Sequence, residues 1–294
     1  MLVSIIIPVF NDVGGLRVTL TSIMQFISNR NDIEIIVCND GGGEHISKIA
    51  ASFGVREVRL EKNKGSYAAR NKGIDASKGE ILAFLDADQQ ITENWLDAGV
   101  ASLNDADYAG GQIKIVTGYN PSDWELVDEI TAFPVKSSLE KMHFAPTANL
   151  FIRKALLDKT GNFNEILRSG GDTDFGIRVF NNGFKQIYVP DAITLHPARN
   201  KAEQIKKLRR IAIGYAELAL LIQNKNRLIF VFGSFGRLIQ VFIEFSWRLL
   251  RYLVFDCWKN DKITLKFIYI NKLRKLIYFW NVMLCAIKII IEYR

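Results

Sequence analysis

Short apolar runs alternate with amphipathic stretches along roughly the first 200 residues of the chain. The runs are typical of buried strands, and they lie at 3–10, 33–38, 55–60, 81–85, 108–116, 147–153 and 184–189. Between the first two runs, Leu16, Leu20, Ile23 and Ile27 recur at the spacing of one helix face. Strands that alternate with helices predict an α/β fold, with a mostly parallel sheet flanked by helices on both faces.

Two carboxylates, Asp86 and Asp88, directly follow the apolar run 81–85. Ligands bind at the carboxyl ends of strands in open α/β sheets. Carboxylates this close together repel one another, and a hard divalent cation such as Mg2+ or Mn2+ neutralises them. The pair therefore indicates a cation site with a phosphate-bearing ligand, although an exposed acidic turn would have the same sequence.

Other candidate ligand groups follow neighbouring runs. Asp40 comes after 33–38 and precedes three glycines, so it is either an acceptor for a ring N–H of a flat ligand or a cap of the next helix. Lys64 and Arg70 flank the start of a helix for which Ser66 is the expected cap. They offer positive charge to a diphosphate, or they form a solvated basic face.

The stretch around 169–199 carries a third group of candidates. Asp172 follows two glycines at the start of a helix and is a candidate general base, while Asp174 is expected to pair with Arg178 four residues later. Alternatively, both acids only stabilise the helix N-terminus. His196 is expected just beyond the last strand, where it is either structural or a metal ligand.

The region 117–143 is predicted to be rich in loops, and loops at this edge usually determine the substrate. Trp124 within it is a candidate sugar platform, with core packing as the alternative.

Taken in order, these motifs resemble the family 2 glycosyltransferases of the GT-A fold over roughly residues 1–200. The residues that carry the resemblance are Ile5 to Phe10, Asn39-Asp40-Gly41, Ala69-Arg70-Asn71 with Gly73, Phe84 to Asp88, Gly170 to Asp172 with Asp174 and Arg178, and His196.

The resemblance implies an inverting, metal-dependent transfer of a sugar from a nucleotide-sugar, most often a UDP-sugar, to a hydroxyl. Asp172 would be the catalytic base, and Asp88, His196 and Asp86 would hold Mn2+ or Mg2+. The residues implied for nucleotide-sugar binding are Pro8, Asn11, Asp40, Lys64, Arg70 and Asp86.

The chain departs from the family pattern in three places. Gly171 replaces the first residue of a usual acidic pair, Asn39 replaces a frequent Asp, and Gln89 follows the Asp-x-Asp where another acid is common. The change at Gly171 leaves the base in place but puts an acceptor contact in doubt. No Gln-x-x-Arg-Trp motif is present, so a processive polysaccharide synthase is not indicated.

Charge divides the chain into an acidic body and a basic tail. Residues 1–200 carry 20 Lys and Arg against 25 Asp and Glu, a net charge of −5, whereas residues 201–294 carry 18 against 6, a net charge of +12. We therefore expect a catalytic domain at 1–200 and a separate basic helical region at 201–294.

The tail contains two strongly apolar stretches, one at 228–255 and one from about Lys272 onward. The polar residues of each stretch fall on one narrow stripe of a helix. The stripe of the first stretch contains Arg237, Gln240, Glu244, Arg248 and Arg251, and that of the second contains Arg274, Asn281, Lys288 and Glu292. A spanning helix needs ~20 mainly uncharged residues, and neither stretch offers them.

Helices that lie in the membrane interface are the favoured interpretation, with Trp247, Trp258 and Trp280 at headgroup level. A soluble helical subdomain, a dimer interface and a re-entrant hairpin are the alternatives. The expected location is the cytoplasmic face of the cell membrane, as a peripheral or monotopic protein.

Three widely spaced cysteines favour a reducing compartment without structural disulfides. Met1 is followed within a few residues by a strand-like run, so no signal peptide is expected. Nucleic-acid binding is disfavoured because the basic residues of the tail are interleaved with aliphatic runs. The expected acceptor is a lipid-linked or nascent glycan. A polyprenyl-phosphate sugar synthase and a non-catalytic sugar-nucleotide-binding scaffold remain open, as do the sugar, the linkage and the oligomeric state.

Overall fold

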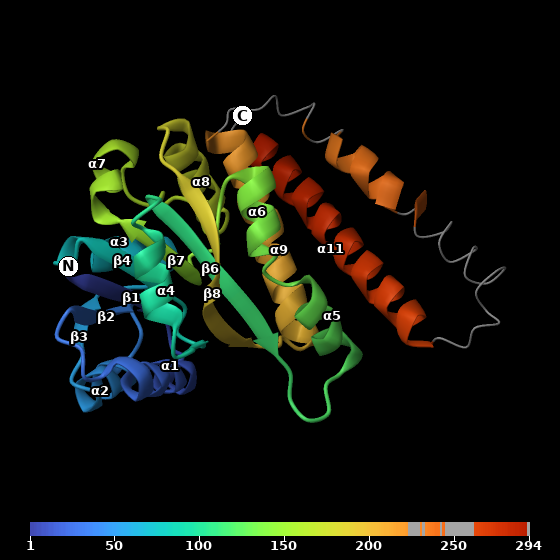
Figure 1. Ribbon diagram of the computed structural model, residues 1–294. Coiled ribbons are helices and arrows are strands. Elements are labelled where there is room, and N and C mark those ends of the chain that lie inside the picture. The colour runs from blue at the N-terminus through green and yellow to red at the C-terminus, as the bar shows by residue number, and fades with distance from the viewer. Residues whose placement is uncertain (223–229, 231–232, 242, 245–261, 293–294) are drawn as a thin grey trace. The chain divides into compact units, whose positions relative to one another are not determined.

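The computed structural model describes residues 1–222, 230, 233–241, 243–244 and 262–292 (Figure 1). The chain forms two compact units: Met1–Val116 with Ala132–Pro197, and Thr117–Thr131 with Ala198–Arg294. The first unit contains the sheet, and the second contains the C-terminal helices. The segment Thr117–Thr131 packs with the second unit, although it is inserted between elements of the first.

Eight strands form one sheet in the order β3-β2-β1-β4-β7-β6-β8-β5. Their bounds are β1 Val3–Val9, β2 Ile33–Asn39, β3 Arg56–Arg59, β4 Ile81–Leu85, β5 Gln90–Ile91, β6 Tyr108–Val116, β7 Asn149–Arg153 and β8 Gln186–Pro197. Strands β3, β2, β1 and β4 are mutually parallel, and so are β6 and β8. Strand β7 runs antiparallel to β4 and β6, and β5 to β8. The predicted α/β fold with a mostly parallel sheet is confirmed.

Helices cover both faces of this sheet. They are α1 Val13–Ile27, α2 Glu44–Ser52, α3 Ser66–Ala76, α4 Trp95–Ser102, α6 Val135–Met142, the 3-10 turn η1 Lys154–Leu156, α7 Leu157–Thr160 and α8 Gly171–Asn181. Because side chains alternate along a strand, Ile5 and Ile7 of β1 pack toward α1 and α2, whereas Ile6 lies under α3. A β-carbon at Gly73 would come within 2.7 Å of Ile6, so glycine lets α3 lie close to the strand.

Two predictions about this first unit were wrong in detail. Ser66 does not cap α3; it is the first helical residue after Gly65, and no side chain caps this helix. The last strand does not end at Val189, because β8 continues to Pro197 and contains His196. The register shifts just after Val189, from Gly111 opposite Val189 to Gln112 opposite Ile193, and pairing then resumes.

The region expected to be loop-rich holds two helices, α5 Asp123–Thr131 and α6. Only residues 132–134 connect α5 to α6, and Phe133 in this connection adopts a left-handed φ of 50°. Loop-like composition here reflects two short helices that belong to different units.

In the part of the chain that the structure describes, the second unit contains α5, α9 Lys201–Glu217, the π-helical turn η2 Leu218–Ile222, the helical segment 233–241 and α11 Lys262–Glu292. A capping box starts α9, in which Asn200 and Glu203 bind each other's backbone N–H. Asp128 of α5 is fully buried, with Arg199 at 3.6 Å and Arg274 of α11 at 4.0 Å. These ion pairs join α5 to the turn before α9 and to α11.

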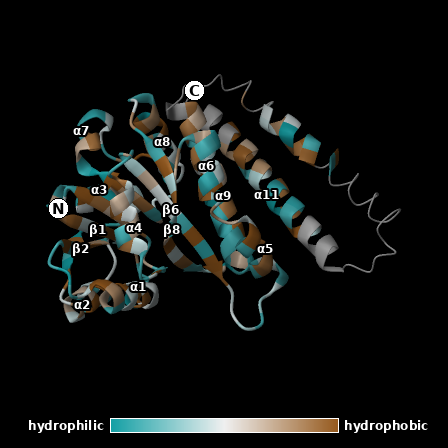
Figure 2. Cartoon of the chain, viewed as in Figure 1, coloured by the Kyte–Doolittle hydropathy of each residue, from teal (hydrophilic) through white to brown (hydrophobic). Residues whose placement is uncertain are grey.

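Helix α11 begins ten residues before the predicted start at Lys272 and mixes hydrophobic and hydrophilic residues along its length (Figure 2). Within the described residues, no helix combines the length and the apolar composition that crossing a bilayer requires. Of the residues assigned to the polar stripes and headgroup positions, Trp247, Arg248, Arg251 and Trp258 lie outside the described residues.

Candidate active site

The predicted site residues come from one edge of the sheet. Strands β1, β2, β4, β6 and β8 point their carboxyl ends toward this edge, and the antiparallel β7 points its amino end there. The strands thus bring Asn11, Asp40, Asp86, Asp88 and His196 to one side of the first unit, as expected for a ligand-binding edge.

Asp40 lies at the end of β2 and is 3% exposed. Its carboxylate accepts the backbone N–H of Lys64 at 2.8 Å and that of Gly65 at 2.9 Å. Burial raises the pKa of Asp40, although these two hydrogen bonds oppose the rise. The carboxylate therefore anchors the loop before α3 and does not cap α2, whose N-cap is Gly43. Each oxygen keeps a lone pair for a ligand N–H.

The other residues assigned to the nucleotide surround Asp40. Pro8 is half-buried on β1 and pairs with Cys38 of β2, next to Asn39. Asn11 is exposed just after β1 and has a left-handed φ of 53°. Its backbone is close to Gly42, because a β-carbon added to that glycine would lie 3.3 Å from the Asn11 backbone N. The Lys64 side chain is exposed at the entrance to α3.

Arg70 and Asp86 form the central ion pair of the site. The Arg70 Nη2 donates to Asp86 Oδ1 at 2.6 Å, and the arginine is 3% exposed. The Nε of Arg70 is also buried and has no hydrogen-bond partner among the described residues. The Tyr67 ring lies 5.9 Å from the guanidinium carbon. Arg70 thus orients Asp86, and the role of Asp86 as a metal ligand stays a prediction.

Asp88 and His196 face each other across the end of the sheet. The His196 Nε2 lies 3.5 Å from Asp88 Oδ2, and the imidazole is 1% exposed. The Nδ1 lies 2.7 Å from the carbonyl oxygen of Pro197. A carbonyl only accepts, so the proton of a neutral imidazole is on Nδ1 and the lone pair of Nε2 is directed toward Asp88. This is the orientation that metal-ligating histidines have.

The pair fits a divalent cation. Two ligands at ~2.1 Å from one ion are at most ~4.2 Å apart, and 3.5 Å is within that limit. Within the described residues, no cluster of three or more His, Cys, Asp or Glu forms a complete cage. Mg2+ is usually held by one or two carboxylates together with substrate phosphates. The donor set is therefore compatible with an ion shared between protein and diphosphate.

Asp172 lies in the first turn of α8 and is half-buried. Thr147, just before β7, donates its hydroxyl to Asp172 Oδ1 at 3.1 Å. Burial raises the pKa of Asp172, Arg70 lowers it and Asp86 raises it. Asp172 therefore shares one electrostatic environment with the Arg70–Asp86 pair. A carboxylate with a raised pKa is suited to accept a proton near neutral pH.

Tyr67 explains why the chain has glycine at 171. A β-carbon on Gly171 would lie 2.6 Å from the Tyr67 ring, so the tyrosine fills the space that a side chain there would need. The ring is 6% exposed, stacks on Phe163 at a centroid distance of 5.9 Å, and its hydroxyl accepts the Asp172 backbone N–H at 3.4 Å.

Sequence reasoning missed Tyr67 and Thr147. The signals were present, because Tyr67 precedes Arg70 by three residues on a predicted helix and Thr147 starts a predicted strand at the ligand edge. The expected pair of Asp174 and Arg178 is confirmed at 2.9 Å. Trp124 is half-buried in the second unit, with the Lys201 ammonium 5.8 Å above its ring.

Comparison with known proteins adds to this geometry. Residues 4–161 match the family described as Glycosyl transferase family 2. The chain is 32% identical over 235 residues to Glycosyltransferase AglE of Haloferax volcanii, covering 78% of this chain and 77% of that protein. It is 27% identical over 210 residues to the Pre-mycofactocin glycosyltransferase of Mycobacterium tuberculosis, covering 68% of this chain but only 43% of that protein.

Solved structures show the same fold. The crystal structure of residues 1–349 of S. aureus TarS has a TM-score of 0.55 and 21% identity, covering 73% of this chain and 65% of that one. The mannosyltransferase PcManGT from Pyrobaculum calidifontis, in complex with GDP-Man and Mn2+, has a TM-score of 0.59 and 17% identity, covering 76% and 65%. TarS has also been solved with UDP and with UDP-GlcNAc.

Proposed function

Since the chain belongs to glycosyl transferase family 2, we propose that it is an inverting, metal-dependent transferase that moves a sugar from a nucleotide-sugar to a hydroxyl of a lipid-linked or nascent glycan. The observation that supports this most is the meeting of Asp88 and His196 at 3.5 Å on the edge that also carries Asp40, Arg70 and Asp172. Each group has a part in binding the donor or activating the acceptor.

The nucleotide binds near Asp40, whose buried carboxylate accepts a base N–H, with Pro8 and Asn11 beside it. Lys64 and Arg70 supply positive charge to the diphosphate. In the comparison structures the bound nucleotides are UDP in TarS and GDP-Man in the mannosyltransferase. A UDP-sugar is our proposed donor for this chain, and a GDP-sugar is the competitor to test.

Asp88 and His196 are the residues that would hold the cation, and Mn2+ was present in one comparison structure. When bound, such an ion neutralises charge on the departing nucleoside diphosphate. Arg70 contributes to the same stabilisation because its guanidinium is already held in place by Asp86 at 2.6 Å.

Asp172 acts on the acceptor. Its raised pKa and its position beside Thr147 leave a carboxylate oxygen able to take the proton of the attacking hydroxyl. A single base, with attack from the face opposite the leaving diphosphate, inverts the configuration at the anomeric carbon.

We place the protein at the cytoplasmic face of the membrane, held by the second unit. Residues 201–294 have a net charge of +12, and α11 exposes Tyr269, Trp280 and Leu284 by 45% or more. Basic residues beside exposed apolar side chains favour attachment to anionic lipid.

A panel of nucleotide-sugars tested for metal-dependent thermal stabilisation is the first experiment. One UDP- or GDP-sugar should raise the melting temperature with Mn2+ or Mg2+ and much less with EDTA. Incubation of that donor, radiolabelled, with membranes then identifies the acceptor. If the label is extracted as a sugar attached directly to a lipid phosphate, the protein is a polyprenyl-phosphate sugar synthase. The basic and apolar second unit is compatible with that function as well. No stabilisation by any donor would contradict the proposal.

A further inference from the structure

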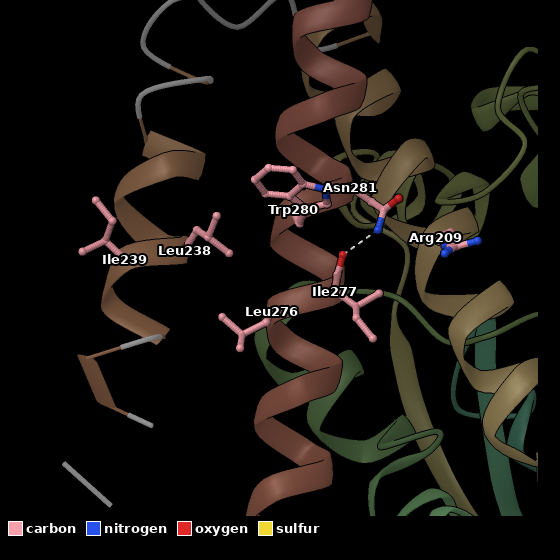
Figure 3. Close-up of a pocket in the computed structure, with 7 residues that line it drawn as sticks. All are labelled: Arg209, Leu238, Ile239, Leu276, Ile277, Trp280 and Asn281. Carbon is pink, nitrogen blue, oxygen red and sulfur yellow. Dashed lines mark hydrogen bonds between the residues drawn. The ribbon is translucent and has the colours of Figure 1, made fainter. Parts of the chain in front are cut away.

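The second unit contains an apolar groove of about 550 Å³. It is lined by Arg209, Leu238, Ile239, Leu276, Ile277, Trp280 and Asn281. Leu238 and Trp280 extend into the space between the helical segment 233–241 and α11 (Figure 3). Small-molecule sites usually have volumes of ~300–1,000 Å³, so this groove, which we call the α11 groove, is large enough for a ligand.

Polar contacts hold the walls of the groove together. The Lys272 ammonium of α11, 5% exposed, lies 2.5 Å from Glu244, which follows the segment 233–241. Arg237 of that segment donates to the Tyr215 hydroxyl of α9 at 3.4 Å. The groove is therefore a feature of the packed unit.

The groove opens onto an apolar stripe. Trp280 is 50% exposed and Ile239 is 45% exposed. On α11 the apolar residues recur at spacings of three and four, which places them on one face, and they are Tyr269, Leu273, Leu276, Trp280, Leu284 and Ile287. The groove is thus open at Trp280 and Ile239, where an apolar group can enter it.

The polar part of the groove is basic. Arg209 is exposed and has no carboxylate partner among the described residues. The Asn281 amide donates to the Ile277 carbonyl oxygen at 2.7 Å and is thereby held on α11. An arginine guanidinium binds phosphate through two parallel hydrogen bonds. A ligand complementary to the groove thus has a hydrocarbon chain and an anionic phosphate.

We propose that the α11 groove binds the hydrocarbon chain of a phosphate-bearing membrane lipid, with the phosphate at Arg209. The inference rests on the membrane contact of the proposed function. A second copy of the chain is a poor occupant, because each copy brings a net charge of +12 in residues 201–294. Free phosphate is also a poor occupant, since five of the seven lining residues are apolar.

Dodecyl phosphate, kept below its micelle concentration, is the probe, and calorimetric titration of the full-length protein is the measurement. We expect one saturable site, weaker binding of dodecyl maltoside, and no displacement by inorganic phosphate at equal concentration. Arg209→Gln should weaken binding about tenfold, the loss of one charged hydrogen-bond donor group. Leu238→Trp fills the groove and should abolish binding.

Leu284→Ser is the matched control, because Leu284 is 45% exposed on the same stripe but does not line the groove. It should bind as the unchanged protein does. Equal losses in Leu284→Ser and Leu238→Trp would overturn the proposal in favour of general interfacial binding. Displacement of dodecyl phosphate by inorganic phosphate would also overturn the proposal. So would a dimer of the protein that dissociates in Leu238→Trp, since the groove would then bind a second copy of the chain. Donor stabilisation measured in the same variants shows whether the proposed function holds independently.

Discussion

The contact between Gly171 and Tyr67 predicts that Gly171→Ala destabilises the first unit. The added β-carbon would lie 2.6 Å from the ring, whereas non-bonded carbons prefer at least ~3.5 Å. The ring would have to move by about 1 Å, the difference between these two distances. It has little room to do so, because Phe163 stacks on it at 5.9 Å and the Arg70 guanidinium lies at the same distance.

The expected loss follows from two opposing terms. Overpacking a well-packed site costs ~1–3 kcal/mol, while alanine gains up to ~1 kcal/mol over glycine in a helix. We therefore expect the free energy of unfolding to fall by about 1–2 kcal/mol. Gly14→Ala is the matched control, also in the first turn of a helix. Its β-carbon would meet only Asp12 Oδ1 at 3.9 Å, so no loss is expected.

Urea unfolding followed by circular dichroism measures the change, with Tyr67→Leu as the second arm of a double-mutant cycle. Leucine at 67 removes the ring, so Gly171→Ala should cost much less in that background. Two results would refute the reasoning: Gly171→Ala as stable as Gly14→Ala, or the same loss with and without Tyr67.

Further predictions concern charge. Asp172→Asn should abolish transfer while donor binding survives, as measured by radiolabel transfer and calorimetry, and unchanged turnover would refute the role as base. The same variant should be more stable than the parent at pH 7, because a carboxyl whose folded pKa is raised costs stability above that pKa. The difference should shrink as the pH falls through the ordinary Asp pKa of about 3.9 and vanish below about pH 3, where the carboxyl is protonated in both states. Arg70→Met should move the acidic limb of the kcat/KM profile to higher pH, since Arg70 lowers the pKa of Asp172; an unmoved limb would contradict this. Asp128→Asn leaves two arginines without their carboxylate and should lower the free energy of unfolding by about 3 kcal/mol, whereas Glu129→Gln, on an exposed position of the same helix, should not change it.

The strands at the ligand edge could be predicted because their signals are local. The run 81–85 is apolar throughout, follows Gly79 and Glu80 and precedes Asp86 and Asp88, and the structure has β4 with the same bounds. The extension of β8 could not be predicted, since Pro190 is a normal end signal and pairing with β6 and β5 carries the strand past it to His196.

Contacts between residues far apart in the sequence could not be predicted either. The fit of Gly171 against Tyr67 joins positions more than 100 residues apart, and no periodicity reveals it. The buried Asp128 likewise meets Arg199, which precedes α9, and Arg274 of α11. In sequence, Asp128 is one acid among several in an amphipathic stretch, so its burial followed only from the packing of the second unit.

Calorimetric titration of the stabilising nucleotide-sugar, with and without Mn2+, tests the central claim most directly. If Asp88 and His196 share a cation with the donor diphosphate, Mn2+ should strengthen donor binding in the unchanged protein and in Asp172→Asn, but not in Asp88→Asn or His196→Ala. Metal-enhanced donor binding that is equally strong in all four proteins would contradict the account.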